Sequence, residues 1–90
     1  MISPADGSSA PPSPLRAVVE TVVRALVDHP DGVRVTETQR RGMTMLELTT
    51  APGDMGKIIG RQGRTVSALR TLVAVTAEKH GQRAQLDLRD

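Results

Sequence analysis

The absence of aromatic side chains is the strongest constraint on what this chain can fold into. None of its ninety residues is Phe, Tyr or Trp. RRM, cold-shock and many OB-type domains stack nucleobases on aromatic rings, so we exclude these nucleic-acid-binding folds. A nucleic-acid binder with this composition would have to grip the phosphate backbone and read bases through aliphatic contacts and hydrogen bonds.

The length of the chain indicates one small domain. Ninety residues leave no room for a second catalytic lobe. A deep pocket for a small molecule is also disfavoured, since such pockets enclose on the order of hundreds of cubic ångströms. We therefore expect one domain that binds an extended partner.

Further classes are disfavoured by what the sequence lacks. It has no Cys, which excludes disulfides and thiolate metal sites and is compatible with a reducing cytosol. Residues 1–14 lack the basic and apolar regions of a signal peptide, and no apolar run approaches the roughly 20 residues of a membrane span. No Ser-His-Asp order, paired carboxylate site or metal-ligand cluster is evident. We predict a cytoplasmic protein that is not an enzyme and holds no cofactor or metal ion.

The beginning of the chain divides into a tail and a helix. Residues 1–14 are rich in Ser, Pro, Ala and Gly and predict a flexible tail, which leaves 15–90 as the domain. Ser13 followed by Pro14 is typical of a helix N-cap and first helical position. An amphipathic helix should follow and end at the turn formed by 29–32. Its expected apolar face consists of Leu15, Val18, Val19, Val22, Val23 and Leu26.

The remaining elements are predicted from hydrophobic periodicity. Alternation of apolar and polar residues predicts strands over 33–38, 43–50 and 84–88, the first two joined as a hairpin through 39–42. Helical spacing and turn residues predict helices over 55–59 and 64–80. In the second strand we place Leu46 and Leu48 on the core side. The buried face expected for the last helix consists of Val66, Leu69, Leu72, Val73 and Ala77.

Positive charge is concentrated in one segment. The formal net charge is only +2, and residues 15–53 hold five basic and five acidic side chains. Residues 56–77 hold no acid, and their basic side chains are Lys57, Arg61, Arg64 and Arg70. The positive field is therefore local to a glycine-rich segment.

That segment contains a four-residue turn, Gly60-Arg61-Gln62-Gly63, between the two predicted helices. Gly tolerates positive φ and has no Cβ to hold a ligand away, so a phosphate could approach the main chain closely. The helix that starts near Arg64 would offer that phosphate unpaired N–H groups and the positive end of its dipole.

Neighbouring side chains complete the predicted site. Arg61 and Arg64, with Lys57 one turn earlier, would neutralise phosphates, while Ile58 or Ile59 and the adjacent strand would form an aliphatic groove for bases. Successive helical residues point about 100° apart, so only one of the two isoleucines can face the ligand. The predicted binding residues are Lys57, Ile58, Ile59, Gly60, Arg61, Gln62, Gly63 and Arg64.

Plainer interpretations of these residues also fit the sequence. The two glycines could merely permit a tight turn, and the basic residues could form a solvated face. A phosphate-binding loop of the type Gly-x-x-x-x-Gly-Lys-[Ser/Thr] is excluded, because Ala51 replaces the first Gly and Ile58 the hydroxyl residue. His29 and His80 are the only imidazoles, and their places in a turn and at a helix end favour structural roles.

The segment from Ile58 to Val66 resembles the KH signature, in which two aliphatic residues precede a Gly-x-x-Gly turn and a third follows it. Residues 15–88 are similar to the bacterial KhpA family of small KH proteins, and the stretches 25–30, 54–65 and 69–72 carry the likeness. The resemblance implies an α+β fold of the type II (prokaryotic) KH class. Its element order is α-β-β-α-α-β, with a three-stranded sheet covered by helices on one face.

The same resemblance implies a function. A KhpA-like protein would bind single-stranded RNA with the four-residue turn as its clamp, as an RNA chaperone or post-transcriptional regulator. Its expected partner is a second copy or a larger KhpB-like KH protein. In some bacteria that pair is tied to cell-wall synthesis and cell length.

Two other functions fit parts of the sequence. A helix-turn-helix DNA reader would use 64–80 as its recognition helix, but the outer face of that helix offers Ala68, Ala74 and Val75 beside few polar groups. A structural adaptor with weak RNA binding would leave the basic Gly-x-x-Gly segment without a role. We therefore favour RNA binding over both.

Overall fold

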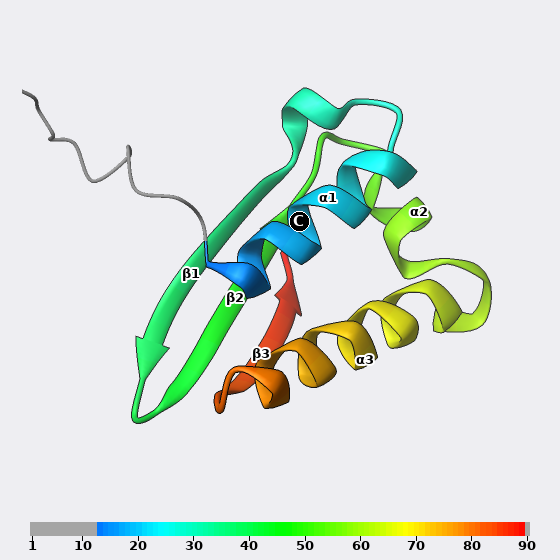
Figure 1. Ribbon diagram of the computed structural model, residues 1–90. Coiled ribbons are helices and arrows are strands. Elements are labelled where there is room, and N and C mark those ends of the chain that lie inside the picture. The colour runs from blue at the N-terminus through cyan, green and yellow to red at the C-terminus, as the bar shows by residue number, and fades with distance from the viewer. Residues whose placement is uncertain (1–12, 90) are drawn as a thin grey trace, which may run out of the picture.

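The computed structural model describes residues 13–89. Three helices, two short 3-10 turns and three strands follow one another in the predicted order (Figure 1). The predicted tail, apart from Ser13 and Pro14, lies outside the described residues. The elements are α1 (Pro14–Leu26), η2 (Pro30–Gly32), β1 (Arg34–Arg40), β2 (Met43–Thr49), α2 (Met55–Ile59), η3 (Arg61–Gly63), α3 (Arg64–Lys79) and β3 (Arg83–Leu88).

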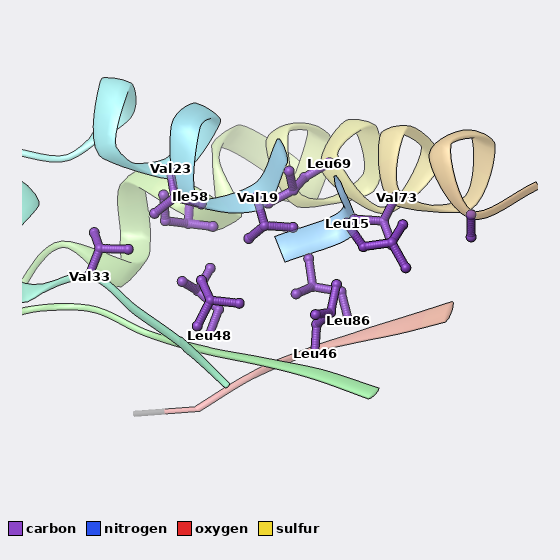
Figure 2. Packing of buried hydrophobic residues seen from close by; sticks show 12 residues of the cluster. Leu15, Val19, Val23, Val33, Leu46, Leu48, Ile58, Leu69, Val73 and Leu86 are labelled. Carbon is purple, nitrogen blue, oxygen red and sulfur yellow. The ribbon is translucent and has the colours of Figure 1, made fainter. Parts of the chain in front are cut away.

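The sheet has the strand order β1-β2-β3. β1 pairs with β2 in antiparallel fashion through the hairpin, whereas β3 lies parallel to β2 on its other side. A parallel neighbour requires a long crossover connection, which α2 and α3 provide. The helices therefore return over the sheet before β3 begins, and they cover one of its faces (Figure 2).

The core lies between that face and the helices, and it is built from aliphatic side chains (Figure 2). Leu46 and Leu48 of β2 are fully buried, which confirms the predicted core side of this strand. Side chains of all three described strands and of α1, α2 and α3 meet in one cluster. Its buried members are Leu15, Val19, Val23, Val33, Val35, Leu46, Leu48, Ile58, Leu69, Val73, Ala77 and Leu86.

Helix α1 begins where the sequence predicts and ends earlier. The Ser13 hydroxyl accepts a hydrogen bond from the Arg16 amide at 3.1 Å, as an N-cap does. The helix stops at Leu26, and the residues of the predicted stop form the separate turn η2. Pro30 prevents the helix from continuing, and the His29 amide instead donates to the Asp54 carboxylate at 3.0 Å. None of the helices within 13–89 is long and apolar enough to cross a bilayer.

The β1–β2 turn is tighter than predicted. β1 continues to Arg40, which pairs with Met43, so only Arg41 and Gly42 form the turn. Both have positive φ, 50° at Arg41 and 77° at Gly42. Such two-residue turns match the twist of the strands that they join.

Two predicted core positions are wrong. Leu72 of α3 is 46% exposed and Leu26 of α1 is 41% exposed. Leu72 lies one position before Val73, which is 2% exposed, and the pair points in directions about 100° apart. Only the Val73 side faces the sheet. Leu26 is the last residue of its helix and passes the edge of the core.

Candidate nucleic-acid interface

A buried carboxylate positions the start of the site. Asp54 precedes α2 and is 2% exposed, yet its side chain does not cap that helix. Asp54 Oδ2 instead accepts the His29 amide at 3.0 Å and lies 3.2 Å from His29 Nδ1. This contact ties the β2–α2 connection to the α1–β1 connection and holds α2 against the core.

The environment of Asp54 also sets its ionisation. Burial acts to raise the pKa of this carboxyl. Hydrogen bonds from the backbone and ring of His29 and from the backbone of Asp28 act in the opposite direction and prevail, so the pKa lies below its ordinary value. The carboxylate form is therefore the one that the fold stabilises.

Gly60 ends α2 in a conformation that only Gly adopts readily, with φ 76° and ψ 174°. A Cβ at this position would also collide with Thr65 in the first turn of α3. It would come within 2.6 Å of the Thr65 Cβ and 3.0 Å of its backbone nitrogen, and would overlap its hydroxyl. Gly60 therefore permits the close approach of two helices.

Gly63 has a different environment. Its φ of 73° and ψ of 14° place it in the left-handed region, and no atom lies within 4 Å of where a Cβ would be. Its amide donates to the Gly60 carbonyl at 3.2 Å, which closes the turn. Gly63 is the N-cap of α3 and supplies no side-chain acceptor. The Arg64 amide donates to the Arg61 carbonyl, and no side chain caps the amides that follow it in the first turn.

The polar side chains of the turn project outward. Arg61 and Gln62 are exposed. Arg64 Nη2 donates to Gln62 Oε1 at 3.1 Å. The Arg64 guanidinium therefore lies beside the four-residue turn, as the sequence predicts. Lys57 has an acidic neighbour that the sequence did not reveal, since its Nζ lies 3.4 Å from Asp28 Oδ2.

The two isoleucines before the turn are divided between core and surface. Ile58 has no exposed area and belongs to the core cluster, whereas Ile59 is 41% exposed. Ile58 therefore has no surface to offer a ligand, although it is among the predicted binding residues. Ile59 is the aliphatic side chain available beside the turn.

A groove lies between α3 and β3. Its first part has a volume of about 250 Å³ and is lined by Arg70 and Val73 of α3 and by the β3 residues Ala84 to Asp87. Arg70 Nε donates to the Leu86 carbonyl at 3.3 Å, so its guanidinium lies across the outer edge of β3. Sequence reasoning did not name the β3 residues. The alternation in 84–88 predicts a strand but does not say which strand it joins.

The sequence that forms this turn and groove is similar to those of known proteins. A family model described as the KH domain of KhpA and KhpB matches residues 16–88. The chain is 47% identical over 76 residues to the RNA-binding protein KhpA of Halalkalibacterium halodurans, covering 84% of this chain and 100% of that relative.

Two more relatives bear the same name. The RNA-binding protein KhpA of Leifsonia xyli is 46% identical over 69 residues, which are 77% of this chain and 88% of that protein. The KhpA of Aquifex aeolicus is 41% identical over 76 residues, 84% of this chain and 96% of its own. The element order and the sheet are those of a type II KH domain. With this fold and a family match that spans nearly all described residues, the chain belongs to the KhpA/KhpB family of KH domains.

Proposed function

We propose that this chain binds single-stranded RNA and catalyses no reaction. The observation that carries the proposal is the open side of Gly63 next to the uncapped first turn of α3, with Arg61 and Arg64 beside it. The amides of this first turn, the positive end of the helix dipole and the exposed guanidinium groups of Arg61 and Arg64 belong to one short segment, which favours a phosphate. The similarity to relatives named RNA-binding proteins supports RNA as the source of that phosphate.

Bases would lie along the α3–β3 groove, whose lining on α3 starts at Arg70. Ile59 offers apolar contact beside the turn, while Arg70 and the unpaired edge of β3 offer hydrogen bonds. KH domains hold about four nucleotides in this manner. The absence of aromatic residues fits such a groove, because the bases would rest on aliphatic side chains.

The proposal is tested by a double substitution in the turn, Arg61→Asp with Gln62→Asp. Both side chains are exposed and the two glycines remain, so the domain should stay folded while two carboxylates repel phosphate. Arg34→Asp with Thr38→Asp, on exposed positions of β1, changes the net charge equally and serves as the control. Fluorescence anisotropy should show loss of binding to single-stranded RNA only in the turn variant, with circular dichroism unchanged in both. Retained binding in a folded turn variant would remove the turn from the site.

Competition between nucleic acids separates this function from DNA reading. The outward face of α3 carries Ala68, Leu72 and Val75, which are unsuited to reading base edges in a duplex. Single-stranded RNA should therefore displace a labelled RNA at concentrations where duplex DNA does not. Displacement by duplex DNA at equal concentration would favour the helix-turn-helix alternative.

We further propose that the working unit is a dimer. Ala68, Leu72 and Val75 are exposed and follow one another by four and three residues, the spacing of a seam between paired helices. A second copy, or the KH domain of a larger KhpB-like protein, would cover this stripe. The family resemblance extends the proposal to a cytoplasmic RNA chaperone or post-transcriptional regulator that acts with such a partner in cell-wall synthesis and cell-length control.

A further inference from the structure

A second group of cations lies at the opposite end of the molecule from the turn between α2 and α3. Arg40 ends β1, Arg41 forms the hairpin turn, and Arg83 begins β3. The sheet register places Arg40, Met43 and Arg83 side by side across the three strands. Figure 1 shows this hairpin end beside the C-terminal end of α3, while the turn before α3 lies at its other end. We call Arg40, Arg41 and Arg83 the hairpin cluster.

The hairpin cluster is not neutralised by neighbours. All three side chains are exposed, and the ion pairs found among residues 13–89 engage Arg16, Arg24, His29, Lys57 and Arg89 as the basic partners. The other end of the same open sheet face differs. There Arg89 pairs with Glu47 at 3.1 Å, and Glu47 lies beside Asp87 in the register. Positive charge is thus balanced at one end of this face and left open at the other.

The hairpin turn carries an Arg where the backbone favours another residue. Arg41 has φ 50°, in the left-handed region that Asn, Asp and Gly adopt more readily. An Asn-Gly pair would suit this turn better. The Arg therefore contributes its charge at the expense of local stability.

The α3–β3 groove includes one member of this cluster, Arg83. Beyond its first part, a second part of about 420 Å³ is lined by residues of the C-terminal half of α3 and by Gln82, Arg83 and Ala84. Ala84 lines both parts, so the part that holds Arg70 and the part that holds Arg83 adjoin at this residue. Helix α3 has 16 residues and spans about 24 Å, so a strand longer than the clamped segment is needed to reach the cluster.

We propose that the hairpin cluster binds further phosphates of the same RNA strand after it passes along the α3–β3 groove. This inference rests on the proposed function, because the turn between α2 and α3 anchors the strand. The chain would hold about four nucleotides at the turn and use the cluster only with longer RNA. Glu78 also lines the second part of the groove and opposes the passage of phosphate there.

The test compares a four-nucleotide and a twelve-nucleotide RNA of the same repeated sequence on the full chain. The variant Arg40→Gln, Arg41→Asn, Arg83→Gln should bind the short RNA as the wild type does and lose at least about tenfold in affinity for the long one at 50 mM salt. The slope of log K against log salt for the long RNA should become shallower by about 2, since three phosphate contacts are lost at roughly 0.7 each. Arg34→Gln, on the same sheet face, is the matched control and should change neither RNA. Glu78→Gln should tighten binding of the long RNA alone.

Folding and alternative partners are separated by further measurements. The Arg41→Asn change alone should raise the melting temperature by about 2–4 °C, which keeps an effect on RNA distinct from unfolding. Wild-type affinity of the triple variant for the long RNA, or equal loss for both lengths, would overturn the proposal. Unchanged RNA binding with lost binding to a polyglutamate peptide would assign the cluster to an acidic protein instead. If the folded variant Arg61→Asp with Gln62→Asp still binds RNA, the proposed function fails. If that variant loses RNA binding while the triple variant keeps wild-type affinity for the long RNA, this inference alone fails.

Discussion

At the scale of single residues, the two glycines of the turn have separable roles. Gly60 allows the backbone of α2 to meet Thr65, whereas Gly63 borders open space. Gly60→Ala should therefore lower the free energy of unfolding by about 2–4 kcal/mol, from strain and collision together, and Gly63→Ala by only about 1 kcal/mol. Urea unfolding followed by circular dichroism measures both.

The effect of these two glycine variants on RNA binding should not follow their effect on stability. Gly63→Ala places a methyl group in the space where phosphate is proposed to lie, so it should weaken RNA binding although it folds. Equal losses of stability in the two variants would contradict the packing around Thr65. Wild-type RNA affinity in Gly63→Ala would place the phosphate elsewhere.

The pair Ile58 and Ile59 offers a second residue-scale test. Ile58→Val removes one buried methyl group and should cost about 0.5–1.5 kcal/mol of stability without a direct effect on RNA. Ile59→Ala should leave the unfolding free energy within about 0.5 kcal/mol and weaken RNA binding, because its side chain is 41% exposed beside the turn. Chemical denaturation and anisotropy on the two variants decide it. A large stability loss in Ile59→Ala would assign this residue to the core as well.

Hydrophobic periodicity does not decide which residue of a neighbouring pair is buried at these positions. The spacing shows that one isoleucine of the pair is buried, but choosing between them requires the angle at which α2 meets the sheet. The prediction that Leu72 is buried is wrong for the same reason, because Leu72 lies at the edge of the helical face whose centre is formed by Leu69 and Val73. The contact of Lys57 with Asp28 joins residues from different connections, and no local pattern reports it.

At the scale of elements, the contact between His29 and Asp54 joins two connections that lie 25 residues apart in the chain. The lowered pKa of Asp54 makes this contact pH-dependent. A depressed carboxyl pKa means that the unfolded state takes up the proton first as pH falls. The stability contributed by Asp54 is therefore complete above the unfolded pKa of about 4 and is lost as pH falls through the lower folded value.

Asp54→Asn isolates this contribution. At pH 6 to 7 the variant should be less stable than the wild type, and the difference should shrink progressively below about pH 4. Thermal unfolding of both proteins across this range gives the difference directly. Asp31→Asn removes an exposed carboxylate without touching the contact and should unfold like the wild type at neutral pH. A difference that is constant from pH 7 to pH 2 would show that the charge of Asp54 does not matter.

The same contact explains which element boundaries could be predicted. The order of helices and strands follows from local periodicity, and α2 has the bounds that its flanking turn residues indicate. The contact that holds the residues after α1 involves Asp54, far along the chain, and the parallel pairing of β3 depends on where the crossover returns. Local patterns contain neither piece of information.

At the scale of the whole molecule, a net charge of +2 conceals two cationic ends. The turn between α2 and α3 begins α3, the hairpin cluster lies near its end, and the α3–β3 groove runs between them. A count of charges along the sequence does not reveal this cationic end, because the sheet alone places Arg40 and Arg83 on either side of Met43. A single strand along this line would meet cations at both ends, and between them a groove in which Asp87 and Glu78 stand among aliphatic side chains.

The exposed stripe of Ala68, Leu72 and Val75 on α3 is the proposed dimer interface, so it determines how many RNA clamps one assembly contains. Two clamps joined in a dimer raise the apparent affinity for an RNA that reaches both, through effective concentration. Leu72→Glu should therefore convert the dimer to a monomer and lower the affinity for an RNA with two binding segments by at least about 100-fold, while binding of a four-nucleotide RNA stays unchanged. Leu26→Glu makes the same chemical change at an exposed leucine outside the stripe and should preserve the dimer. Light scattering at micromolar concentration, with and without a KhpB-like partner, measures the assembly. A wild-type protein that is monomeric in both conditions yet binds short RNA at nanomolar concentration would refute the dimer, because one clamp would then suffice.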